Sequence, residues 1–204
     1  VYLARGASFA EAKDEAQAIV AYRKAFELFK ELFPDTATSP PPAQISDLAY
    51  SALERSGDLD LTRAKSLGTF SGLPEDQKKK WKEYLDQANE NYSQAILGLS
   101  QGKVAATLSK LVNLALFRFQ SGEAPVEDCL KPFRDLAAQA SAQPGLVAQI
   151  LFSQASVPFE ANQVSLALRL YEDAYKKSME TKVMLDWRDL ERYARALLNA
   201  NKND

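Results

Sequence analysis

The sequence predicts an all-α fold, and three observations lead to this prediction. Apolar residues recur at intervals of three and four over most of the 204 residues, the spacing that gives a helix one apolar face. Alternating apolar and polar runs joined by Asn-Gly or Asp-Gly turns, which are typical of β-hairpins, are missing. One phrase occurs twice, as AIVAYRKAF at residues 18–26 and as ALRLYEDAY at residues 167–175, which indicates that a helical unit recurs.

Two helices are expected over residues 2–13 and 16–33, with a short break near Asp14. Pro34 ends the second helix because a proline pushes the residue before it out of the helical region. Residues 34–44 contain three consecutive prolines and predict a stiff, extended loop. Such a segment can also be a ligand for an aromatic groove, but a spacer between helices is the favoured interpretation.

Glycines set the next boundaries. A helix over residues 45–55 is expected to end at Gly57, and a shorter one over residues 61–67 to end before Gly68, because glycine commonly follows the last helical residue. The turn over residues 68–73 lacks the Gly-Lys-Ser/Thr ending of a phosphate-binding loop, so nucleotide binding is not predicted.

A long helix is expected to begin at Pro74 and to continue as far as Gly102. Its buried stripe comprises Trp81, Leu85, Ala88, Tyr92, Ile96 and Leu99. Lysines at positions 78–80 and 82 surround Trp81, a pattern that can serve nucleic-acid binding. Acidic residues four positions from these lysines favour a solvated face instead, with contact to an acidic partner as the alternative.

The second half is also expected to consist of helices. One over residues 104–120 is apolar around its axis and is therefore expected to be central. A helix that begins at Pro125 should kink or restart at Pro132, and Pro158 should limit a helix over residues 146–157. The last helix, over residues 185–199, is expected to bury Trp187, Leu190, Tyr193, Ala194, Leu197 and Leu198.

The composition is that of a folded protein. Hydrophobic residues make up 46% of the chain and charged residues 25%, so a single domain over residues 1–204 is expected. The net charge of −2 provides no field that would attract nucleic acid or an anionic membrane. No apolar run approaches the roughly 20 residues of a transmembrane helix, and none is predicted.

The repeated phrase places two alanines and a tyrosine on one helix face, so a neighbouring helix can approach closely beside the ring. This phrase resembles the second helix of a tetratricopeptide repeat, a unit of two antiparallel helices of about 34 residues. The residues that match are Ala18, Tyr22 and Ala25, preceded by Gly6 and Phe9, and Ala167, Tyr171 and Ala174, followed by Trp187 and Leu190. Between the copies, Cys129, Phe133 and Leu136 keep the spacing with a larger last residue.

The resemblance implies a right-handed α-solenoid of antiparallel helix pairs, irregular in the middle, that acts as a noncatalytic protein-protein interaction scaffold. A peptide, a helix or a partner subunit would bind its curved surface, on the first helices of the units. The candidate partner contacts are Arg5, Lys13, Gln149 and Arg188.

The residues that usually carry catalysis are scarce. The chain has no histidine and a single cysteine, Cys129, so the commonest general base and metal ligand are missing, as is a multi-cysteine zinc site. Adjacent acidic pairs such as Glu75 and Asp76 diverge by about 100° on a helix and do not converge on a metal. We therefore predict no enzyme activity, no cofactor and no metal.

Two alternatives to the scaffold remain open. One is an irregular helical bundle that holds an apolar ligand such as a lipid in a core lined by Phe117, Phe119, Phe152 and Phe159. The other is a domain of an enzyme whose chemistry lies outside this segment. The chain begins at Val1 with neither an initiator Met nor a signal sequence, so we expect a processed or excised fragment, with a bacterial cell-envelope or periplasmic setting.

Overall fold

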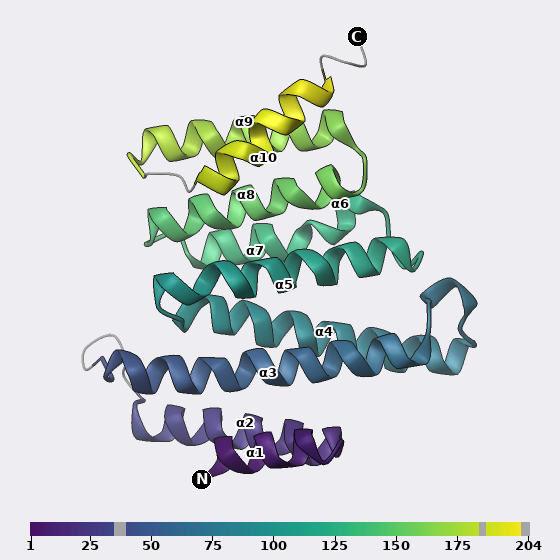
Figure 1. The fold of residues 1–204 in the computed structure, drawn as a ribbon, viewed down its shortest axis with the longest axis vertical. Coiled ribbons are helices and arrows are strands. Elements are labelled where there is room, and N and C mark those ends of the chain that lie inside the picture. The colour runs from purple at the N-terminus through teal and green to yellow at the C-terminus, as the bar shows by residue number, and fades with distance from the viewer. Residues whose placement is uncertain (35–39, 184–186, 201–204) are drawn as a thin grey trace. The chain divides into compact units, whose positions relative to one another are not determined.

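The computed structural model describes residues 1–34, 40–183 and 187–200, and within these ranges the chain is all-α without any strand, as predicted (Figure 1). Its helices are α1 (Tyr2–Glu11), α2 (Glu15–Leu32), α3 (Ala43–Leu67), the 3-10 helix η1 (Phe70–Gly72), α4 (Glu75–Gly98), α5 (Gln101–Gln120), α6 (Val126–Cys129), α7 (Lys131–Gln139), α8 (Pro144–Glu160), α9 (Val164–Glu180) and α10 (Trp187–Ala200). None of these described helices has both the length and the apolar character that crossing a bilayer requires.

The chain divides into two compact units, Val1–Thr107 and Leu108–Asp204, and a single domain over residues 1–204 stays a prediction. Of the proline-rich loop predicted at 34–44, residues 35–39 lie outside the described residues. The start of the last predicted helix, at Leu185, also lies outside them.

The first unit is built from the pairs α1–α2 and α3–α4 and includes the beginning of α5. Helices α3 and α4 run antiparallel, because Gly68 at the end of α3 meets Trp81 near the start of α4, and Tyr50 near the start of α3 meets Gly98 at the end of α4. The stripe predicted for α4 is buried as expected, since each member from Trp81 to Leu99 is at most 8% exposed.

Glycines in this unit mark places where a tyrosine ring packs against a helix backbone. Gly57 was predicted to end a helix, which is wrong: it lies in the middle of α3, and a Cβ there would stand 2.8 Å from the ring of Tyr92. Gly6 on α1 faces the ring of Tyr22 in the same way, and a Cβ there would stand 2.6 Å from Cδ1 of that ring. The missing side chain is therefore used for close helix packing at Gly57, and not for a turn.

The prediction that one helix continues to Gly102 is also wrong, because the chain turns between α4 and α5. Leu99 adopts an extended conformation with ψ of 149°, and α5 begins at Gln101. Asp47 of α3 accepts hydrogen bonds from the backbone N–H of Ser100 at 2.9 Å and from its hydroxyl at 3.0 Å. These bonds, which lower the pKa of Asp47, satisfy a donor at the start of α5 and stabilise the break.

One turn type recurs in both units. Lys13, Gly122, Asn162 and Lys182 each follow a helix and have positive φ, between 54° and 75°. In all four turns, the N–H of the residue after the positive-φ residue bonds the carbonyl five positions back, and the positive-φ N–H bonds the carbonyl three positions back. This is the Schellman motif, which reverses the chain within a few residues and so sets up antiparallel helix pairs.

In the second unit, the pair α8–α9 repeats the pair α1–α2 at an offset of 149 residues. Asn162 occupies the position of Lys13 in the turn, with φ of 59° against 60°. Tyr171 occupies the position of Tyr22, and both are buried. Each ring belongs to an apolar cluster that also includes an alanine from the next helix, Ala52 of α3 in one case and Ala196 of α10 in the other.

Prolines act differently at two positions in the second unit. Pro132 marks a restart as predicted, because α6 ends at Cys129 and α7 begins at Lys131. Pro158 was expected to limit its helix, which is wrong: it lies inside α8, which continues to Glu160. Pro158 lies in the last turn of α8, so little of the helix follows it, and its carbonyl accepts the N–H of Gln163 in the turn after the helix.

The burial predicted for the last helix is mostly wrong. On α10 only Ala196 is buried, and Tyr193 is partly buried against the α8–α9 cluster. Trp187 is 67% exposed and Leu198 61% exposed. The reason is that α10 contacts α8 and α9 along one side, and no other described residue covers its opposite apolar face.

Candidate interaction site

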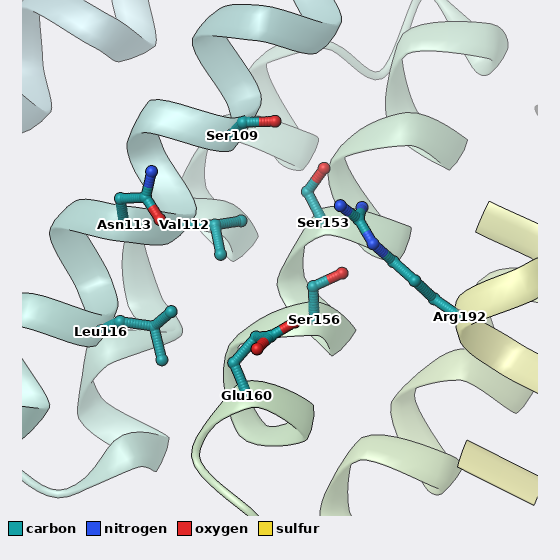
Figure 2. Close-up of a pocket in the computed structure, with 8 residues that line it drawn as sticks. All are labelled: Ser109, Val112, Asn113, Leu116, Ser153, Ser156, Glu160 and Arg192. Atoms are coloured by element: carbon teal, nitrogen blue, oxygen red, sulfur yellow. The ribbon is translucent and has the colours of Figure 1, made fainter. Parts of the chain in front are cut away.

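A hollow of about 290 Å³ in the second unit is the candidate site, and we call it the α5–α8–α10 hollow. It is lined by Ser109, Val112, Asn113 and Leu116 of α5, by Ser153, Ser156 and Glu160 of α8, and by Arg192 of α10. Figure 2 shows these side chains converging on one space from the three helices.

The α8 wall is a stripe of polar side chains on a mostly apolar helix. Ser153, Ser156 and Glu160 are spaced by three and four residues, so they lie on one face. The Ser156 hydroxyl donates to the carbonyl of Phe152 at 3.1 Å, so the 3.0 Å contact with Tyr171 has the Tyr171 hydroxyl as donor. Both hydroxyls therefore use their protons in hydrogen bonds within the core. Ser153 makes no hydrogen bond to another described residue, so its hydroxyl can bind a ligand.

The α5 wall combines polar and apolar side chains. Ser109, Val112, Asn113 and Leu116 again follow the three- and four-residue spacing of one helix face. The amide of Asn113 is exposed and carries both a donor and an acceptor, the pair of groups that a polypeptide backbone also presents. Val112 and Leu116 supply apolar contact area beside it.

Two opposite charges line the hollow. The guanidinium of Arg192 points from α10 toward α8 and Ser153, and Glu160 lies near the other end of the α8 stripe (Figure 2). Within the described residues, neither side chain forms an ion pair or a hydrogen bond, although both line the same hollow. Their charges are therefore available to a ligand.

Two of the predicted contact residues lie close to this hollow in helical register. Gln149 is on α8 one turn before Ser153, and Arg188 is on α10 one turn before Arg192. Both residues lie on helices that border the hollow, but neither lines it, and the lining residues of α8 and α10 were not among the predicted contacts. The signal was present in the sequence of α8, where Gln149 continues the three- and four-residue spacing of the stripe of Ser153, Ser156 and Glu160.

The other two predicted contacts lie in the first unit. Arg5 lies on α1 beside a groove between α1 and α2, where its guanidinium stands 5.5 Å from the centre of the Phe9 ring. Lys13 was expected on the first helix, but it is the positive-φ residue of the turn that follows it. As partner contacts, all four residues stay predictions.

A buried polar cluster in the first unit has a structural explanation. Arg23 of α2 donates to Asp60 of α3 at 2.9 Å, and Asn91 of α4 donates to the same carboxylate oxygen at 3.2 Å. Asp60 is fully buried, and burial raises its pKa while Arg23 and Arg63 oppose the rise. Its other oxygen, Oδ1, has no partner within the described residues. The cluster joins three helices in one register.

The groups considered for catalysis do not assemble. Cys129 is 3% exposed, and burial raises the pKa of its thiol to about 11, so the thiol is protonated at neutral pH. Among the described residues, no group of three or more histidine, cysteine, aspartate or glutamate side chains could hold a metal ion. In the lysine-rich part of α4, Lys78 pairs with Glu75 at 2.6 Å, and Lys78 and Lys82 lie over the ring of Phe70.

Comparisons with protein-family models, with curated proteins and with solved structures each found no match.

Proposed function

We propose that this protein is a noncatalytic interaction scaffold, a right-handed α-solenoid of tetratricopeptide-like helix pairs that binds a segment of a partner protein in the α5–α8–α10 hollow. The observation that carries the proposal is the hollow, where α5 and α8 each present residues of one face, and α10 presents Arg192, to a common space. Helices α5 and α8 each precede a Schellman turn, and α10 follows one, so all three are in the place of first helices. This is the face on which the resemblance puts partner contacts.

The internal repeat supports the solenoid part of the proposal. The turns at Lys13 and Asn162 have the same hydrogen bonds, and Tyr22 and Tyr171 occupy equivalent buried positions. Helix pairs that repeat in this manner stack through nearest-neighbour contacts, and a preformed surface spares a ligand part of the entropic cost of binding.

The alternative function, storage of an apolar ligand in the core, has less support. Phe152 is fully buried with its ring centre 5.9 Å from that of Tyr171, and Phe159 lies edge-on to the same tyrosine at 6.3 Å. These rings fill the α8–α9 core by packing on each other.

Selection of random dodecapeptides by display on the purified chain tests the proposal. The matched variants are Asn113→Trp, which fills the hollow from an exposed position, and Lys176→Trp, at an exposed position of α9 outside the lining. We expect enriched peptides to lose binding to the Asn113 variant and to keep binding to the Lys176 variant. Enrichment that Asn113→Trp does not affect, or no enrichment, contradicts the proposal, and native mass spectrometry showing a copurified lipid favours the alternative.

A further inference from the structure

We infer that the partner segment in the α5–α8–α10 hollow is extended and carries two charges, an acidic side chain that binds Arg192 and a basic side chain that binds Glu160. This inference rests on the proposed function and names the chemistry of its ligand. It follows from the unused charges of the hollow, from their opposite sign and from the size of the space.

Arg192 is the cation that a ligand can use. Its neighbour Arg195 is already paired with Glu191 at 2.6 Å, whereas Arg192 has no ion pair or hydrogen bond within the described residues. Its guanidinium points toward the uncommitted hydroxyl of Ser153 (Figure 2). A guanidinium fork and a hydroxyl together match the two oxygens of a carboxylate, the group that arginine binds with two parallel hydrogen bonds.

Glu160 limits which acidic ligand can bind. It makes no hydrogen bond or ion pair of its own within the described residues, so it repels a second negative charge in the same space. A polyacidic or phosphorylated segment is disfavoured, because its extra charge would lie in one hollow with this carboxylate. A segment with one acidic and one basic side chain can pair with both Arg192 and Glu160, and it leaves neither charge unpaired.

The size of the hollow and its α5 wall favour an extended segment. A space of about 290 Å³ is at the small end of ligand sites, and an α-helix with its side chains is roughly 10–12 Å across. The Asn113 amide can donate to and accept from the backbone of an extended chain, and Val112 and Leu116 can contact one small apolar side chain.

Charge reversal in the same display selection tests the inference. Peptides selected on the wild-type chain should be enriched in Asp or Glu together with Lys or Arg, and should bind Arg192→Gln about tenfold more weakly. Peptides selected on the Arg192→Glu variant should carry a basic residue where the wild-type peptides carry the acidic one. Peptides selected on the Glu160→Lys variant should carry an acidic residue where the wild-type peptides carry the basic one. Circular dichroism of each variant confirms that these exposed substitutions leave the fold intact.

The two proposals fail in different ways. If the selected peptides bind in an Asn113-dependent manner but show no charge preference, or keep the same preference on Arg192→Glu, the inference is overturned and the proposed function stands. If no Asn113-dependent peptide is selected, the proposed function is overturned and the inference falls with it.

Discussion

Replacing Gly57 by alanine gives the sharpest test of the packing described for α3 and α4. A Cβ at this position would lie 2.8 Å from Cε1 and 3.0 Å from Cδ1 of Tyr92, whereas carbon atoms in contact normally stay about 3.5–4.0 Å apart. Tyr92 cannot move aside easily, because it is fully buried and its hydroxyl donates to Asp58 at 2.8 Å.

The expected magnitude follows from two opposing effects. Alanine in place of glycine in a helix interior stabilises by about 1 kcal/mol, and overpacking a well-packed core costs about 1–3 kcal/mol. We therefore expect Gly57→Ala to destabilise the chain by about 1 kcal/mol, with about 2 kcal/mol as the upper end. Gly102→Ala is the matched control: it lies in the first turn of α5 with nothing within 4 Å of an added Cβ, so only the stabilising effect should act.

Urea denaturation followed by far-ultraviolet circular dichroism measures both variants. The two should change the free energy of unfolding in opposite directions, and Tyr92→Leu should relieve most of the cost of Gly57→Ala in a double-mutant cycle. If Gly57→Ala is stabilised as much as Gly102→Ala, the close approach of Gly57 and Tyr92 is refuted.

Three further predictions concern single buried groups. Because burial raises the pKa of Asp60, this carboxyl keeps its proton to higher pH in the folded chain than in the unfolded chain. The free energy of unfolding should therefore fall as pH rises from about 4. Denaturation at a series of pH values should show that Asp60→Asn removes this fall, and an unchanged pH dependence in the variant would contradict the prediction. Tyr171→Phe should cost about 1 kcal/mol through its bond to Ser156, whereas Tyr22→Phe, whose hydroxyl has no hydrogen bond among the described residues, should cost less in the same denaturation assay. Cys129, with a pKa raised to about 11, should react with a thiol reagent near neutral pH only after unfolding, and fast labelling of the native chain would show that its burial is wrong.

Local patterns in the sequence predicted most of the helices. The stripe from Trp81 to Leu99 is buried because its spacing is a property of the helix itself. The errors occurred at residues with more than one structural use. In the sequence, Gly57 is equally compatible with the end of a helix and with a position of close helix packing. Only its contact with the ring of Tyr92 shows that it is a packing position.

None of the four predicted partner contacts lines the hollow, for a related reason. The sequence pointed to the face of α8 that carries Gln149 and to the face of α10 that carries Arg188. Which turn of each face borders a hollow depends on how α5, α8 and α10 pack, and that packing selects Ser153 and Arg192. No spacing within one helix contains this information.

The sequence by itself determined most of the helices, the buried stripe of α4 and the recurrence of a small-aromatic-small packing phrase, because these depend on residues three and four positions apart. Only the tertiary structure decided that Gly57 receives Tyr92, that Arg23 and Asn91 share Asp60, and that Arg192 and Glu160 line one space. These relations join residues some 30 or more positions apart in the sequence, where helical periodicity imposes no constraint and the packing of whole helices sets the distances.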